Sequence, residues 1–117
     1  MATNDTLASL TSTAGALASL YLDQEGNVTA SAGKKGKDLE LVASAALGAF
    51  EAALQLSREL GRGPLQEVVV GYTQGPILIR AISEQFPSPL LVVELSSMDK
   101  LGQTRIHLAR AIEELTG

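Results

Sequence analysis

The hydrophobic pattern is most regular over residues 37–60, where it predicts one long helix. This stretch contains no proline, and its only interior glycine is Gly48. At about 1.5 Å per residue the helix is roughly 36 Å long, close to the diameter of a small domain. Its apolar side chains cover an arc of roughly 220°, whereas the apolar stripe of a surface helix is usually just over ~100° wide. One sheet face cannot cover that arc, so we expect the helix to pack on its own sheet and on another chain.

Small residues lie along one border of this arc, where Ala45, Ala49 and Ala52 recur at helical spacing. Side chains of this size let a second helix approach closely. We therefore expect these three alanines, with Leu56, to lie in an interface between two chains.

Alternation of apolar and polar residues predicts five strands around the long helix. The first two, at residues 16–22 and 28–32, are joined by the turn Asp23-Gln24-Glu25-Gly26 and form a hairpin. Three more follow the helix, at residues 65–72, 77–82 and 90–95, and the last is nearly continuous in apolar character, as in a strand covered on both faces.

Helices are expected at both ends of the chain. A narrow apolar stripe predicts a final helix over residues 100–115, with cap candidates at residues 96–99. Residues 1–12 are rich in Thr, Ser and Asn, and they allow a short helix capped by Asn4 or Asp5, whose order the pattern leaves open.

These elements predict an α/β (α+β) fold with the core order ββαβββα, in a single domain over residues 1–117. We expect one five-stranded, mostly antiparallel sheet, with the long helix on one face and the terminal helices on the other. The simplest right-handed crossover places the last strand beside the first. Val68, Val69 and Val70 then lie on an edge strand, whose open backbone groups and β-branched side chains invite pairing with another chain.

Composition excludes several classes of function. Lys and Arg number 9 against 13 Asp and Glu, a net charge of −4, so nucleic acid is not an expected partner. The absence of cysteine excludes disulfides, thiol nucleophiles and cysteine-ligated metals. The N-terminus lacks the features of a signal peptide, and no uninterrupted apolar run approaches the ~18 residues that span a bilayer. We expect a cytoplasmic protein without direct membrane insertion.

Candidate chemical groups each have a simpler structural explanation. Glycines and lysines at residues 33–37 could cradle a phosphate at the helix start, but they match no nucleotide-binding motif, and a solvated connection is favoured. His107 is the only histidine and is expected to be solvated on the last helix. Glu94 and Asp99 could form a carboxylate pair, although Asp99 is better explained as a helix cap.

Two arginines are candidates for an arginine finger, which must reach a γ-phosphate. Arg62 lies in a glycine loop, and Arg80 lies on a strand where alternation favours a solvent-facing side chain. The triplet Asn27-Val28-Thr29 matches a glycosylation acceptor, but the chain shows no signal for export. We therefore predict no catalytic, cofactor-binding or metal-binding residue, and no enzyme activity.

Three segments resemble the roadblock / dynein light chain family, in its small stand-alone prokaryotic form. Residues 20–28 run from a strand into an acidic turn that closes on glycine. Residues 59–63 end the alanine-rich helix, and residues 98–105 open the last helix. The resemblance covers roughly residues 7–116 and concerns pattern and topology, since none of the segments is a catalytic signature.

This resemblance implies a homodimer whose edge strands join two sheets into one ten-stranded sheet beneath an antiparallel pair of long helices. It also implies a regulatory or scaffold role with a small Ras-like GTPase as partner, docked on the helix-bearing face. The sparsely charged arc of Ser44, Gly48, Glu51 and Gln55 is the expected partner surface, with ordinary solvated surface as the simpler explanation.

A second hypothesis is a small-ligand sensor with an apolar pocket between sheet and helix. The sequence leaves open which GTPase is bound and whether the effect is activation, recruitment or tethering. It also leaves open whether the dimer partner is an identical chain or a paralogue.

Overall fold

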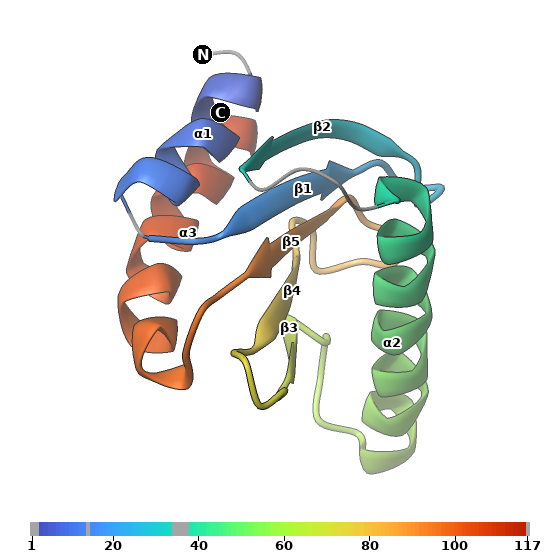
Figure 1. Cartoon of the computed structure of the whole chain (residues 1–117). Helices are drawn as coiled ribbons and strands as arrows, with labels where there is room; N and C mark the ends of the chain where they lie inside the picture. Colours follow the sequence, from blue (N-terminus) through green and yellow to red (C-terminus); the bar gives the residue numbers. More distant parts are fainter. Residues whose placement is uncertain (1–2, 14, 34–37, 117) are drawn as a thin grey trace.

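The computed structural model describes residues 3–13, 15–33 and 38–116, and these form three layers around one sheet (Figure 1). Helix α2 (Leu39–Leu60) covers one face of the sheet, and α1 (Thr3–Thr13) and α3 (Leu101–Thr116) lie together on the other. This arrangement confirms the predicted α+β fold class, with the long helix opposite the two terminal helices.

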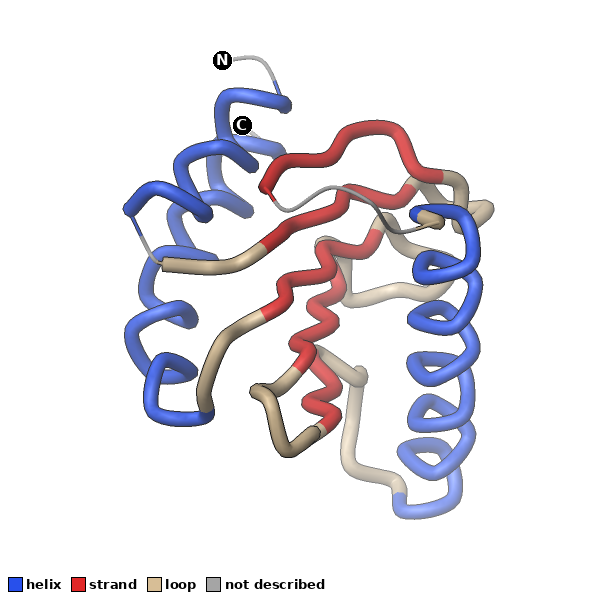
Figure 2. The backbone as a smooth tube through the Cα atoms, in the orientation of Figure 1, coloured by secondary structure: helices blue, strands red, loops and turns tan. Residues whose placement is uncertain are grey.

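The sheet is antiparallel throughout and has the strand order β2-β1-β5-β4-β3 (Figure 2). The crossover places β5 beside β1 and leaves β3 on an edge, as predicted. The strands are β1 (Ala18–Leu22), β2 (Val28–Gly33), β3 (Glu67–Val70), β4 (Ile77–Ala81) and β5 (Leu90–Glu94). β1 and β3 are shorter than the predicted segments 16–22 and 65–72. Residues 16–17, 65–66 and 71–72 belong to loops.

Central strand β5 separates two apolar cores, because successive side chains point to opposite faces of a sheet. Leu91 and Val93 point toward α1 and α3, whereas Leu90 and Val92 point toward α2. All four are almost completely buried. The continuous apolar run at residues 90–95 is thus explained by cover on both faces.

Helix α2 has a defined start and end. The Asp38 carboxylate accepts hydrogen bonds from the backbone N–H groups of Glu40 (3.2 Å) and Leu41 (3.3 Å), so Asp38 is the N-cap instead of a first-turn residue. At the other end Gly61 takes a left-handed conformation, with φ at 63°, and donates its N–H to the Ser57 carbonyl.

Helix α1, whose order the sequence left open, is an 11-residue helix in the structure. Leu7 and Leu10 are buried against the sheet and α3, and the buried Ser19 hydroxyl donates to the Leu7 carbonyl at 3.2 Å. Asn4 and Asp5 lie inside the first turn, so neither is the cap. The packing of two leucines thus orders a segment whose own sequence favours a helix only weakly.

The last helix begins differently from expectation. A 3-10 turn, η1 (Met98–Lys100), precedes α3, and Ser97 occupies its N-cap position. The Ser97 hydroxyl donates to the Asp99 carboxylate. The prediction that Asp99 caps the helix is therefore wrong by two residues.

Candidate functional site

Helix α2 has three surfaces that differ in burial: the face on the sheet, the side toward β2 and the side toward β3. Ala43, Ala46 and Phe50 are buried on the sheet. On the side toward β2, Leu47 packs so closely on the hairpin turn that a Cβ at Gly26 would lie 2.6 Å from its Cδ2 atom. On the side toward β3 a groove separates the C-terminal part of the helix from the strand, and exposed leucines lie on this side.

We define the α2 flank as the apolar residues of α2 that follow one another at intervals of three or four positions on the side toward β3. Leu41, Leu56 and Leu60 are 68%, 60% and 59% exposed, which is unusual for three leucines on one helix. The smaller members between them are exposed or half-buried. The complete set is Leu41, Ala45, Ala49, Ala52, Leu56 and Leu60.

The sequence predicted four of these residues as interface and missed the other two. Leu41 and Leu60 each lie four residues beyond a predicted member, Ala45 and Leu56, on the same side of the helix. That spacing was the signal that could have identified them, since α2 extends far enough in both directions to include them.

Edge strand β3 lies on the same side of the molecule. The Gln66 carbonyl accepts a hydrogen bond from the Ala81 N–H at 2.9 Å, so the backbone of Gln66 faces β4. Because the direction alternates along an antiparallel strand, Glu67 and Val69 turn their N–H and C=O groups to the open edge. The side chains of Val68, Val69 and Val70 are half-buried within the chain.

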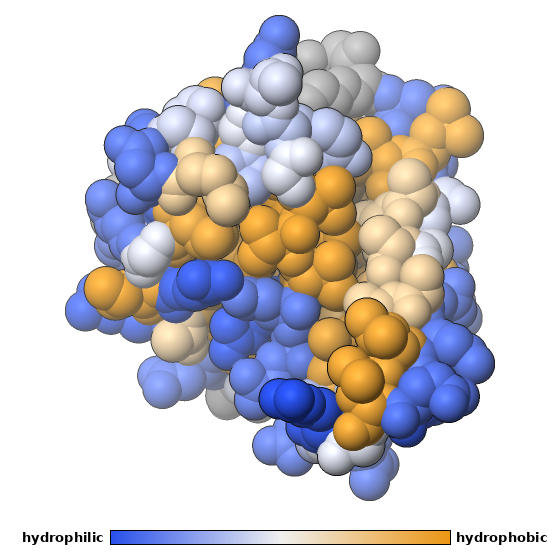
Figure 3. Space-filling model, turned by 90° about the horizontal axis from the view of Figure 1, so that it is seen from below, coloured by the Kyte–Doolittle hydropathy of each residue, from blue (hydrophilic) through white to orange (hydrophobic). Residues whose placement is uncertain are grey.

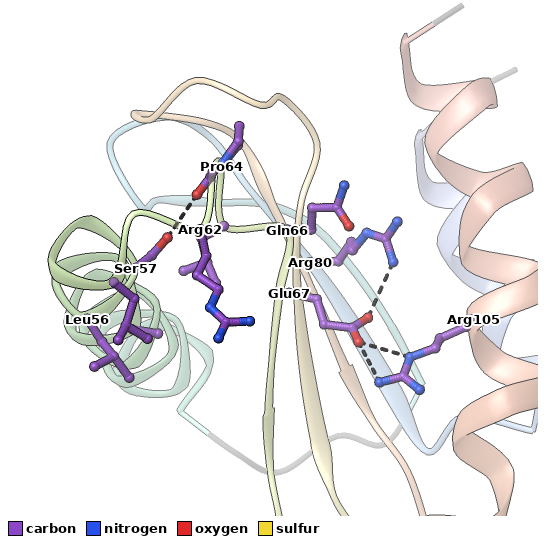
Figure 4. Close-up of a pocket in the computed structure, with 12 residues that line it drawn as sticks. Leu56, Ser57, Arg62, Pro64, Gln66, Glu67, Arg80 and Arg105 are labelled. Atoms are coloured by element: carbon purple, nitrogen blue, oxygen red, sulfur yellow. Dashed lines mark hydrogen bonds and ion pairs between the residues drawn. The ribbon is translucent and has the colours of Figure 1, made fainter.

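A groove of about 760 Å³ separates the end of α2 from β3. One wall is apolar, formed by Ala53, Leu56 and Leu60, and the other is charged (Figure 4). Arg62 extends into the space between the walls from the loop after α2, and the Ser57 hydroxyl holds that loop by donating to the Gly63 carbonyl at 2.9 Å.

The charged wall is a cluster of three side chains from three elements. The Glu67 carboxylate accepts from Arg80 of β4 at 3.3 Å and from the Arg105 Nε of α3 at 2.9 Å. The side chain of Glu67 is only 19% exposed and that of Arg80 27%, so the expectation of a solvent-facing Arg80 is wrong. Arg80 lies opposite Glu67 in the pairing of β3 with β4, and Glu67, which Arg105 of α3 also holds, shields it from solvent.

Apolar surface also continues beyond the groove. Seen from below, the molecule has a hydrophobic region that crosses the centre of the view, with more hydrophilic residues around it (Figure 3). Helix α2 is long and apolar enough to cross a membrane by length and composition, a test that core helices of soluble proteins also pass. Only 17% of the residues in its most apolar 18-residue window are buried within this chain.

The other predicted residues are placed as follows. Ser44, Gly48, Glu51 and Gln55 are all exposed on the side of α2 that faces away from the sheet. His107 is half-buried on α3, and Glu94 is half-buried at the end of β5. Of the phosphate-cradle candidate at residues 33–37, Gly33 ends β2 and residues 34–37 lie outside the described residues.

The described residues also bear on a metal site and on the ligand-sensor hypothesis. Within residues 3–13, 15–33 and 38–116, no group of three or more His, Cys, Asp or Glu side chains could hold a metal ion. The pocket between the first turns of α2 and the sheet, lined by Leu39, Val42 and Ile77, has a volume of about 30 Å³. Pockets for small molecules typically measure ~300–1,000 Å³, so this one does not fit the ligand-sensor hypothesis.

Comparison with known proteins identifies the family. The model of the Roadblock/LC7 domain matches residues 2–93. The chain belongs to the Roadblock/LC7 domain family. Two uncharacterised proteins of Methanocaldococcus jannaschii, MJ1340 and MJ0310, are 32% and 31% identical to it over 109 residues, which cover 93% of this chain and 92% of each relative.

Solved structures with the same fold include several proteins named MglB. Myxococcus xanthus MglB superposes with a TM-score of 0.86 at 23% identity, covering 97% of this chain and 91% of that one. The gliding protein MglB of Thermus thermophilus gives 0.82 at 25% identity, covering 95% and 83%. A structure described as MglB with a tetrameric arrangement gives 0.84 at 25% identity, covering 97% and 84%. The predicted family resemblance is therefore confirmed.

Proposed function

We propose that this Roadblock/LC7 chain is a non-catalytic regulatory module that forms a homodimer and binds a small Ras-like GTPase in the cytoplasm. One observation carries the dimer: the open β3 edge and the exposed α2 flank lie on the same side of the molecule, across one groove. An edge strand alone invites many partners, but an edge beside a long apolar helix flank selects a partner that offers both. A second copy of the chain offers both.

The dimer joins β3 to the β3 of the second copy and continues the sheet to ten strands. The two α2 helices then lie side by side on one face and cover each other's flank. This removes the three exposed leucines from water and hydrogen-bonds the outward backbone groups of Glu67 and Val69. The tetrameric arrangement described for one MglB structure supports self-association as a property of this fold.

The GTPase part of the proposal rests on family membership and on the surface that remains after dimerisation. Ser44, Gly48, Glu51 and Gln55 lie on the outer side of α2, so a dimer presents two such arcs side by side. Their low charge suits a surface that docks against a folded protein. The family resemblance implies a regulatory role, and the Roadblock/LC7 match over residues 2–93 supports a role through binding.

Sedimentation velocity of the purified chain tests the dimer. We expect a dimer at micromolar concentration, and we expect Ala49→Glu to raise the dimer dissociation constant at least ~100-fold, because it places an unpaired charge in the helix contact. Ser44→Glu, on the outer side of the same helix, is the matched control and should leave the dimer intact. A wild-type chain that stays monomeric would contradict the proposal.

The GTPase is tested with the dimer as bait. A nucleotide-binding protein captured from the native host is purified, and its GTP hydrolysis rate is measured with and without this chain. We expect a changed rate, or unchanged hydrolysis with stable binding, and we expect Gln55→Arg to abolish binding while the dimer persists. Binding of purified GTPases that is equally strong with Gln55→Arg would place the docking surface elsewhere.

A further inference from the structure

The groove between α2 and β3 differs in charge from the rest of the chain. Among the described residues that line it, three are basic, Arg62, Arg80 and Arg105, and one is acidic, Glu67. Three positive charges less one negative charge give the lining a net charge of +2, whereas the whole chain has a net charge of −4. The groove therefore attracts anions although the net charge of the protein is negative.

One of the three cations has no partner among the described residues. The Glu67 carboxylate accepts hydrogen bonds from Arg80 and Arg105. Arg62 extends into the space between the two walls and forms no ion pair with a described residue (Figure 4). Its guanidinium group is thus available to an anion in the groove, with the planar pair of donors that fits a carboxylate.

The two bonded arginines also keep donors for a ligand. Arg80 gives Glu67 one nitrogen and Arg105 gives it two, so each guanidinium group retains N–H groups that Glu67 does not use. The side chain of Arg105 is 44% exposed, which leaves part of it open to the groove. An anion on Arg62 therefore has further cations nearby on the charged wall.

The opposite wall suits an aliphatic chain. Leu56 and Leu60 are 60% and 59% exposed, and Ala53 lies with them on the same wall. Among the described residues of the lining none is aromatic, so the groove has no surface on which a base or a sugar ring could stack. Its volume of about 760 Å³ lies in the ~300–1,000 Å³ range of small-molecule sites.

We propose that the groove binds an aliphatic carboxylate of medium chain length, with its head on Arg62 and its tail along Leu56 and Leu60. A small inorganic anion would leave the leucines in water, and an uncharged aliphatic molecule would leave Arg62 without a partner. Only a ligand with both parts uses both walls. This site differs from the apolar pocket that the sequence predicts, because one of its walls is charged.

The same ligand competes with a second copy of the chain. Leu56 and Leu60 belong to the groove and also to the α2 flank, which the proposed homodimer covers. This step rests on the proposed function: a tail on these two leucines occupies surface that the second copy needs. Binding therefore favours the separate chain, so the ligand regulates assembly.

NMR titration of the isotope-labelled chain tests the site with octanoate, octanol and acetate. Octanol has the tail without the charge, and acetate has the charge without the tail. We expect octanoate to bind at least about tenfold more tightly than either, with the largest shifts at the Arg62 Nε–H and at residues 56–67. Equal affinity for octanoate and octanol, or octanoate shifts centred outside the groove, overturns the site. Capture by phosphatidylglycerol vesicles without octanoate binding also overturns it, since the cations would then meet a membrane surface.

Two pairs of variants locate the contacts. Arg62→Gln should weaken octanoate binding about tenfold and leave octanol binding unchanged. Arg110→Gln, on an exposed part of α3 outside the groove, is its control and should change neither. Leu60→Asn should weaken octanoate as well, whereas Leu41→Asn, at the other end of the same flank, should not. A loss that the two leucine variants share would come from the flank as a whole and overturns the groove as the site.

Sedimentation velocity tests the competition. If each copy binds one octanoate only when it is separate, octanoate at about ten times its dissociation constant raises the apparent dimer dissociation constant about 100-fold. The same concentration should have a much smaller effect on Arg62→Gln. A dimer that persists while the titration shows filled grooves overturns the competition. A chain that is monomeric without octanoate instead contradicts the proposed homodimer, and the titration still decides whether the groove binds the carboxylate.

Discussion

The sheet has two edges, β2 and β3, and the chain builds them from different residues. β2 reads VTASAG and is composed of small or polar side chains apart from its first residue. β3 reads EVVV, three β-branched residues after one carboxylate. β-Branched side chains favour extended strands that pair well, whereas small side chains contribute little to pairing.

The surroundings of the two edges differ in the same sense. The pairing of β2 with β1 shifts register between Tyr21 and Leu22, and α1 packs on β2. β3 pairs with β4 without a shift, and beside it lies the groove, with the exposed α2 flank beyond. Irregular pairing protects a strand edge from other chains, and a regular edge next to apolar surface invites them. The comparison therefore indicates that β2 ends the sheet, whereas β3 is suited to pair with a strand of another chain.

A proline on β3 should give the largest effect among the tests of the difference between the two edges. Val69 turns its N–H to the open edge, so Val69→Pro removes a hydrogen bond between copies and leaves the bonds to β4 in place. We expect a folded monomer, with the dimer dissociation constant raised about 100-fold or more, as measured by sedimentation and circular dichroism. Val68→Pro is the matched control, because the Val68 N–H faces β4 and its loss should destabilise the monomer itself. Dimers of Val69→Pro as tight as wild type would show that β3 is not the contact.

A single lysine on each edge should separate the two edges with a smaller effect. Val70→Lys on β3 places a charge beside the partner strand, and we expect it to weaken the dimer about tenfold in sedimentation equilibrium. Ser31→Lys on β2 should leave the dimer unchanged, because Ser31 is exposed on the other edge. Equal weakening by both lysines would mean that assembly depends on net charge instead of one particular edge.

Substitutions in the charged cluster at the start of β3 should change the free energy of unfolding more than they change the dimer dissociation constant. Glu67→Gln leaves Arg80 half-buried with a weaker partner, and we expect a loss of about 1 kcal/mol in the free energy of unfolding in urea. Arg105→Ala, which removes the more exposed partner, should cost less. An unchanged urea midpoint for Glu67→Gln would show that the cluster contributes nothing to the fold.

The cluster of Glu67, Arg80 and Arg105 also marks where sequence reasoning stopped. Glu67 and Arg105 lie 38 residues apart, and only the packing of α3 on the sheet brings them together. Alternation along β4 identifies the face of Arg80 but not what covers it. For the same reason the local pattern predicts a cap at Asp99, since it does not reveal that a 3-10 turn precedes α3.

The fold itself was predictable because each element has a local signal that agrees with the others. Gly61 ends α2 where the apolar pattern ends, and the continuous apolar run at residues 90–95 indicates a strand covered on both faces. The wide apolar arc of α2 could also be predicted, because the positions of apolar residues along a helix can be read from the sequence alone. The sequence does not show which part of that arc the sheet covers. That division depends on the position of α2 over the sheet, so the exposure of Leu41 and Leu60 is seen only in the structure.

The hairpin that carries β2 should give the smallest effect, and one that depends on pH. The backbone N–H of Asn27, with further donors from Asn27 and Glu25, lowers the pKa of the exposed Asp23 carboxyl below its ordinary value. A lowered pKa means that the folded state favours the carboxylate, so its stabilisation is present above about pH 4 and is lost as pH falls through the folded pKa.

We therefore expect Asp23→Asn to be slightly less stable than wild type at pH 7 in urea titrations, and the gap to close as the pH falls through the folded pKa of wild-type Asp23. Glu25→Gln, in the same turn, is the control and should show a smaller change. Because β2 is the edge that ends the sheet, Asp23→Asn should not alter the dimer at neutral pH. A gap that stays constant across the titration would mean that the charge of Asp23 plays no part, and that the β2 hairpin depends on the shape of its turn alone.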